Sequence, residues 1–346
     1  MSRNDVHLVG SIPLASAEEV FTRLCDSLGP HLCRLPDGET GERARWVYWQ
    51  RTMLENHPQM EVDPDGGTLK LHEWDGTLLR ETDLMRFKPG VDPTTVVYDT
   101  GYDTANIASW QTFSHMQSQG RIPTDLRYQV ALPTPMSSAF MYVSPAAYED
   151  YFATYEKSLL TALANIVVAV PSEKLSIQWD ICQEVLIFEN YFSTRPKDYK
   201  ERIFALMGRL GGSVPAGVEL GYHLCYGTPR DKHLVMPKDA TILAELGNAI
   251  VHRVERRVDY LHLPVPQDRD DEAYFAPLAD LDLSGGTKLY LGLIHYNDPA
   301  GDRARMAAAG RVCKNFGIAT ECGWGRADPD RLDGLLAAHV EAVSIL

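Results

Sequence analysis

The chain has 346 residues, of which 45% are hydrophobic, and its formal net charge at pH 7 is -14. This length and composition suit a soluble globular protein with a large core, and an α/β barrel holds such a length as one domain. With 33 Lys and Arg against 47 Asp and Glu, the chain lacks the basic surface that nucleic acids and anionic membranes require, which excludes both as general partners.

The opening residues do not have the pattern of a secretory signal, and no apolar stretch is long enough to cross a bilayer. A cytoplasmic location is therefore expected. The six cysteines are too few for a disulfide framework in a chain of this length. We expect them to be free thiols or metal ligands.

Apolar runs bounded by turn residues alternate with segments of helical periodicity along the chain. Several of the helical segments begin at Ser or Asp, as helix N-caps do. Eight strands and the intervening helices predict a single (β/α)8 TIM barrel over residues 1–346, with functional side chains at the carboxyl ends of the strands. The predicted strands are 6–13, 31–39, 127–135, 175–182, 217–225, 258–266, 287–296 and 317–325.

The segment between the second and third predicted strands, residues 56–126, is too long for a simple crossover. It is rich in Asp, Gly and aromatic residues and contains a helical stretch, "DTANIASWQTFSHMQSQG". We expect it to be an insertion near the mouth of the barrel.

The run "GVELGYHLC" in the fifth predicted strand places Glu219, His223 and Cys225 on one face, because strand residues alternate sides. An imidazole and a thiolate together suit zinc. Two other strand ends carry similar residues, His262 in "VDYLHLPVP" and Cys322 in "GIATECGWG". Each of these residues taken singly is more often a buried core residue than a ligand, but together they offer two nitrogens and two sulfurs at one barrel mouth.

Five motifs, in chain order, resemble those of the catalytic barrel of cobalamin-independent methionine synthase, and more closely its short single-barrel relatives. They are "HLVGSIPLAS", "LPDGETGER", "LSIQWDICQEV", "YHLCYG" and "ATECGWG". The H-x-C and the late E-C-G are the specific part of the resemblance. It implies a TIM barrel that binds zinc and acts on a thiol.

By this resemblance, zinc is bound by His223, Cys225 and Cys322. The fourth ligand of the family is a glutamate at the end of the sixth strand, and His262 stands in its place here. Glu219 is a less suitable substitute because it lies deeper in the barrel.

The family holds its amino-acid thiol with residues that correspond to Ser11, Glu39 and Asp180. Carboxylates on converging strand ends can bind an ammonium group, and a serine can orient a carboxylate. An acidic turn that only leads into a helix is the alternative reading of "PDGETGE".

Two features depart from the family. The stretch "PTPMSSAF" replaces the one that helps to hold the folate, and "LIHYNDP" places Asn297 where the family has a histidine, with the imidazole moved to His295. Methionine synthesis from methyltetrahydrofolate is therefore not expected. His295, Asn297 and Asp180 are the candidates for catalytic roles.

The sequence thus predicts a zinc-dependent enzyme that transfers a methyl or alkyl group to a small-molecule thiol. The alternatives are a carbon–sulfur lyase acting on a thioether, a metal-free barrel resembling uroporphyrinogen decarboxylase, and a non-catalytic thiol- or metal-binding protein. The arginines that such a decarboxylase needs are not evident at the strand ends. The alkyl donor and the oligomeric state stay open.

Overall fold

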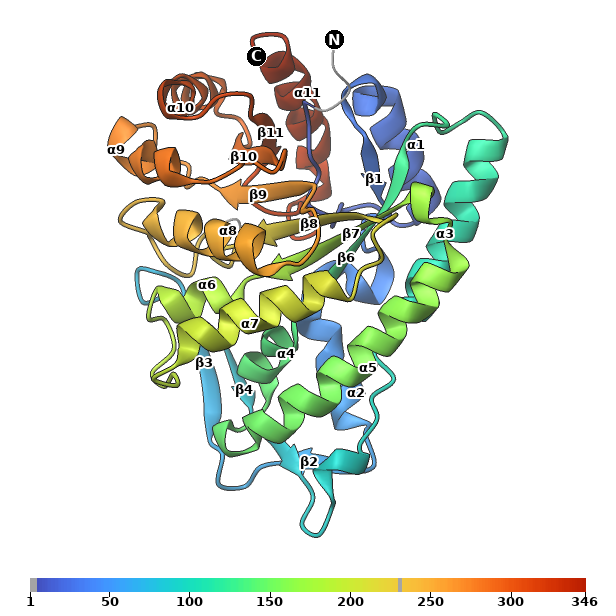
Figure 1. Cartoon of the computed structure of the whole chain (residues 1–346), viewed down its shortest axis with the longest axis vertical. Helices are drawn as coiled ribbons and strands as arrows, with labels where there is room; N and C mark the ends of the chain where they lie inside the picture. The colour runs from blue at the N-terminus through green and yellow to red at the C-terminus, as the bar shows by residue number, and fades with distance from the viewer. Residues whose placement is uncertain (1–4, 230–231) are drawn as a thin grey trace.

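A parallel seven-stranded sheet forms the centre of the computed structural model, which describes residues 5–229 and 232–346 (Figure 1). All six neighbouring pairs are parallel. In order across the sheet, the strands are β1 (Arg34–Pro36), β6 (Arg127–Pro133), β7 (Leu175–Ile181), β8 (Glu219–Leu224), β9 (Tyr260–Pro264), β10 (Lys288–Ile294) and β11 (Gly317–Thr320). Each of them falls within one of the predicted strands.

The first predicted strand, residues 6–13, is not a regular strand. Its residues instead form isolated parallel bridges at both edges of the sheet, Val6 with Ile318 of β11 and Ser11 with Gly38, which follows β1. Because one segment bonds to both edge strands, the sheet curls around toward itself. This α/β arrangement is that of a TIM-like barrel.

Helices cover the outside of the sheet (Figure 1). Helix α1 shows why they form: Ser16 accepts a hydrogen bond from the Glu19 N–H as an N-cap, and the helix buries Val20, Phe21 and Leu24 against the barrel. The helices of the outer layer are α1 (Ala17–Leu28), α3 (Tyr102–Ser118), α5 (Tyr148–Ala169), α7 (Tyr199–Gly212), α8 (Thr241–Arg253), α9 (Glu272–Phe275), α10 (Pro299–Val312) and α11 (Leu332–Val343).

The segment between β1 and β6 contains two small sheets in addition to its helices. After the 3-10 segment η2 (Gly41–Trp49) and α2 (Gln50–Glu55) come two two-stranded sheets, one of β2 (Met60–Val62) with β5 (Met85–Phe87) and one of β3 (Thr68–His72) with β4 (Leu78–Asp83). Most of these elements make up the lower part of the molecule in Figure 1.

Helix α3 confirms the helical stretch expected in residues 56–126, but it lies on the outer layer of the barrel. Its Trp110 and Phe113 rings pack against Tyr128 of β6. The two small sheets, rather than α3, are therefore the elements that depart from a simple β/α unit. That the whole segment is an insertion stays a prediction.

Two short helices, α4 (Pro135–Tyr142) and α6 (Gln183–Phe188), follow β6 and β7 directly. Within the described residues, no helix combines the length and the apolar character that a membrane crossing needs.

Charged side chains fill the sheet interior below the strand ends. The Arg34 guanidinium, 2% exposed, donates two hydrogen bonds of 2.9 and 3.0 Å to the Glu219 carboxylate. Glu219 therefore forms its ion pair away from the strand ends. This agrees with the expectation from the sequence that Glu219 lies deeper in the barrel than His223 and Cys225. This leaves the strand ends themselves to supply the site.

Candidate metal centre

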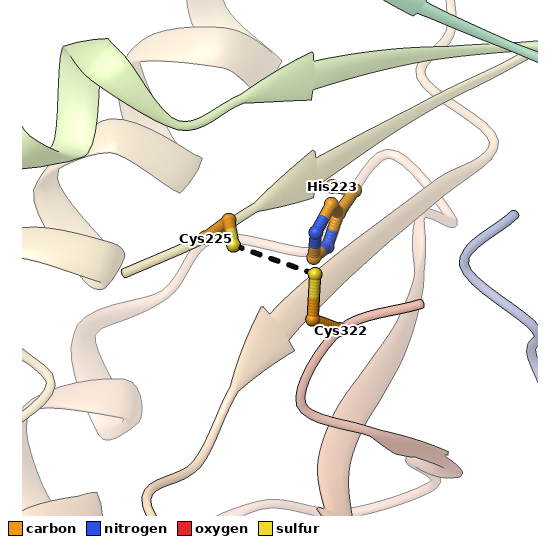
Figure 2. Close-up of side chains that lie close together, drawn as sticks. All are labelled: His223, Cys225 and Cys322. Carbon is orange, nitrogen blue, oxygen red and sulfur yellow. Dashed lines mark hydrogen bonds between the residues drawn. The ribbon is translucent and has the colours of Figure 1, made fainter. Parts of the chain in front are cut away.

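Three side chains from two strand ends meet at one point: His223 on β8, Cys225 just after β8, and Cys322 just after β11 (Figure 2). Their possible ligand atoms all lie within 4.8 Å of one another. His223 and Cys225 share a face of β8 because they are two residues apart, as the alternation of the strand predicts. The parallel sheet then brings the loop after β11 to the same end.

The donor set of this group fits zinc. The Cys225 and Cys322 sulfurs are 3.7 Å apart (Figure 2). Two thiolates on a tetrahedral zinc, each at about 2.3 Å, are separated by about 3.8 Å. The sulfurs thus already have the spacing of two zinc ligands, and His223 adds a nitrogen donor.

His262, the fourth ligand expected from the sequence, lies outside this group of three. It is fully buried on β9, directly opposite His223 in the strand register. Its Nδ1 atom is 2.6 Å from His223 Nδ1, and its Nε2 atom is 3.0 Å from the Thr320 carbonyl oxygen. The structure therefore places His262 against His223, and its role as a ligand stays a prediction.

The two cysteines of the group differ in acidity. A hydrogen bond from Cys225, together with the nearby Arg326 guanidinium, holds the pKa of Cys322 well below its usual value. Hydrogen bonds with Cys182 and Cys322 raise the pKa of Cys225. Cys322 is therefore the more acidic thiol of the pair, and Cys225 donates a hydrogen bond to it.

A cavity opens next to this group and is lined by His223, Cys225 and Cys322. Ser11, Glu39 and Asp180 line the same cavity, although they come from three other strand ends. The structure thus brings the three expected substrate-binding residues and three of the four expected ligands into one space. Their binding roles stay predictions.

Glu39 and Asp180 give the cavity two perturbed carboxyl groups. Burial and the neighbouring Asp180 raise the pKa of Glu39 to about 8. Burial raises the pKa of Asp180 to about 6. Two carboxyl groups that resist ionisation in one cavity favour a cationic ligand, which would restore their charge.

Backbone geometry aims Glu39 into the cavity. Gly38 has a φ of 80° and Glu39 a φ of 49°, both in the left-handed region. A Cβ at Gly38 would lie 2.6 Å from Val20 Cγ2, so only glycine fits there. The "DG" of "LPDGETGER" is thus a requirement of the turn that presents Glu39.

Among the residues of this cavity that the sequence analysis missed are Trp46, Cys182 and Arg326. The Trp46 indole N–H donates to Asp180 Oδ2 at 3.2 Å, and Arg326 Nη2 donates to the Cys322 sulfur at 3.2 Å. Cys182 had a signal, since it comes two residues after Asp180 at the end of β7. Trp46 lies within the 3-10 segment η2 and Arg326 in the loop after β11, and no regular sequence period describes either place.

The other two candidate catalytic residues lie elsewhere. His295 lines a second cavity, which adjoins the first at Thr228, Cys322 and Gly323. Burial lowers the pKa of His295 to about 4, so its imidazole is neutral. Asn297 is exposed and lines neither of these cavities.

Two solved structures share this fold over the whole chain. A B12-independent methionine synthase from Shewanella sp. W3-18-1, described in complex with selenomethionine, matches with a TM-score of 0.61 and 14% identity, covering 100% of this chain and 98% of that one. This chain has the fold of that enzyme. A methyltransferase from Methanosarcina mazei matches with a TM-score of 0.51 and 12% identity, covering 96% and 94% of the two chains.

The shared fold agrees with the barrel that the sequence motifs implied. At these identities, the likeness extends to the fold alone. No protein-family model matches the chain, and no curated protein matches it. The function therefore has to be argued from the residues of the site.

Proposed function

We propose that this protein is a zinc-dependent enzyme that transfers a methyl or another alkyl group to a small-molecule thiol. The observation that carries the proposal is the group of His223, Cys225 and Cys322 at the edge of a cavity that also holds Glu39 and Asp180. A metal-binding donor set and a cation-binding carboxyl pair in one space suit a substrate with both a sulfur and an ammonium group.

His223, Cys225 and Cys322 would hold the zinc. When bound, zinc lowers the pKa of a thiol ligand and so makes a nucleophilic thiolate available at neutral pH. The role of the protein in this chemistry is to orient the substrate and to keep water away from it.

Asp180 and Glu39 would bind the ammonium group of the substrate. Trp46 fixes Asp180 by its indole N–H, and the Ser11 hydroxyl accepts a hydrogen bond of 3.2 Å from the Gly325 N–H, which ties the first segment to the loop after β11. The cavity also has apolar side chains, Leu71, Met141 and Leu234 among them. They would exclude water from the reacting sulfur.

Metal content is the test of this proposal. Protein purified without added metal should contain close to one zinc per chain, and removal of zinc should abolish alkyl transfer to thiols such as L-homocysteine, L-cysteine and 2-mercaptoethanol in a screen with several methyl donors. Active protein without metal would refute the proposal. It would favour the metal-free decarboxylase-like alternative, for which Arg45 and Arg326 in the cavity would then be the residues to examine.

The same site could act as a carbon–sulfur lyase on a thioether. Product analysis separates the two reactions, because a transferase consumes the thiol in proportion to the donor, whereas a lyase releases a new thiol from a single substrate.

A further inference from the structure

The hydrogen bonds of His262 determine which of its ring nitrogens carries the proton. Its Nε2 atom lies 3.0 Å from the Thr320 carbonyl oxygen. A carbonyl oxygen only accepts, so Nε2 must be the N–H. A neutral imidazole carries one N–H, and the fully buried ring has no carboxylate partner in the described chain to stabilise a charged form. The Nδ1 atom of His262 is therefore an acceptor.

His262 in turn fixes the tautomer of His223. The two Nδ1 atoms are 2.6 Å apart, so His223 Nδ1 must donate the proton between them. The remaining nitrogen of His223, Nε2, then keeps its lone pair. Figure 2 shows the ring beside both cysteine sulfurs.

The same distances argue against His262 as a zinc ligand. The Nδ1 lone pair of His262 accepts the hydrogen bond that His223 Nδ1 donates, with 2.6 Å between the two nitrogens. The other nitrogen of His262 is occupied by Thr320. Neither nitrogen of His262 is therefore available to bind a metal beside Cys225 and Cys322.

We propose that His262 is a positioning residue, which fixes the tautomer and the orientation of His223 so that His223 Nε2 is offered to the metal. This inference rests on the metal site of the proposed function. In metal sites, the second ring N–H of a histidine ligand commonly bonds to an acceptor that sets its tautomer. Here the acceptor is the imidazole of His262, itself held by the Thr320 carbonyl group.

Zinc K-edge X-ray absorption on the wild-type protein tests the assignment directly. We expect two sulfurs and one imidazole around zinc; two imidazoles would overturn the proposal. Two variants add an independent test. His262→Gln keeps one acceptor and one donor and should hold zinc within about threefold of the wild type, whereas His262→Leu should weaken zinc binding by about 10- to 100-fold. Equal losses in both variants would contradict a positioning role.

Nitrogen-15 NMR of histidine-labelled, metal-free protein separates this proposal from the proposed function. We expect His223 as the Nδ1–H tautomer in the wild type and a mixture of tautomers in His262→Leu. Zinc bound with two imidazoles would refute the positioning role and leave the function intact. A wild type that shows the expected tautomer but takes up no zinc would end the proposed function, and the role of His262 toward a metal with it.

Discussion

Glu39→Gln is the substitution that tests the cation-binding half of the site. Burial and Asp180 raise the pKa of Glu39 to about 8, so at pH 7 about nine in ten molecules carry the neutral carboxyl group. An ammonium group binds the ionised form and must therefore displace that proton. Ionising Glu39 one pH unit below its pKa costs about 1.4 kcal/mol, or a factor of about ten in affinity.

The affinity for an amino-acid ligand should therefore rise with pH. Between pH 7 and pH 8 the ionised fraction of Glu39 increases about fivefold, and the association constant should increase by about the same factor. This window lies above the pKa of Asp180, which is about 6. L-Methionine is the suitable probe because its thioether does not titrate.

Isothermal titration calorimetry in two buffers of different ionisation enthalpy measures both effects. We expect the wild type to release close to one proton per bound L-methionine at pH 7, and Glu39→Gln to release none and to bind with an affinity that does not change over this window. Wild-type binding without proton release, and with the same flat pH dependence as the variant, would refute the reasoning.

Unfolding by urea provides a check that needs no ligand. The folded pKa of Glu39, about 8, lies above the value of 4.5 for an unperturbed glutamate. Its contribution to stability is therefore fully present below pH 4.5 and is lost as the pH rises toward 8, by at most about 1.4 kcal/mol per pH unit. Relative to the wild type, Glu39→Gln should gain stability between pH 5 and pH 8, and parallel curves for the two proteins would contradict the raised pKa.

Further changes test the rest of the site. Cys225→Ser and Cys322→Ser should each lower zinc to well below one equivalent per chain, whereas Cys313→Ser, at a buried cysteine that follows α10, should keep it; elemental analysis decides. Asp180→Asn should weaken L-methionine binding by about tenfold or more and leave the zinc content unchanged, and a loss of zinc would mean that Asp180 is a ligand. Exhaustive chelation should abolish alkyl transfer, and added zinc should restore it.

The strand pattern made most of the fold predictable. Seven of the predicted strands are present because an apolar run between turn residues describes a strand of a parallel sheet well. Residues 6–13 have the same pattern but form only isolated bridges, since they bond to β11 with one end and pair beyond β1 with the other. The hydrophobic pattern of a segment indicates that it is buried and extended. It does not indicate which neighbouring strands complete its hydrogen bonds.

The site was predictable where a residue follows from its place on a strand. His223 and Cys225 share a face by alternation, and Cys322 comes at the next strand end that carries a thiol. Trp46 could not be found in this way because it lies within η2 at a φ of 50°, a conformation that a bulky side chain rarely adopts. Arg326 likewise reaches its partners only through the path of the loop after β11.

Arg326 and His262 together change the charge of the site from what the sequence resemblance implied. A neutral imidazole in place of a carboxylate removes one negative charge, and the Arg326 guanidinium, 3.2 Å from the Cys322 sulfur, adds a positive one. Both changes withdraw electron density from sulfur in the site. A substrate thiolate held here would be a weaker nucleophile and a better leaving group, because both properties follow the basicity of sulfur. If the protein transfers alkyl groups as proposed, the transfer would call for a reactive donor, and the cleavage of an activated thioether belongs in the same screen.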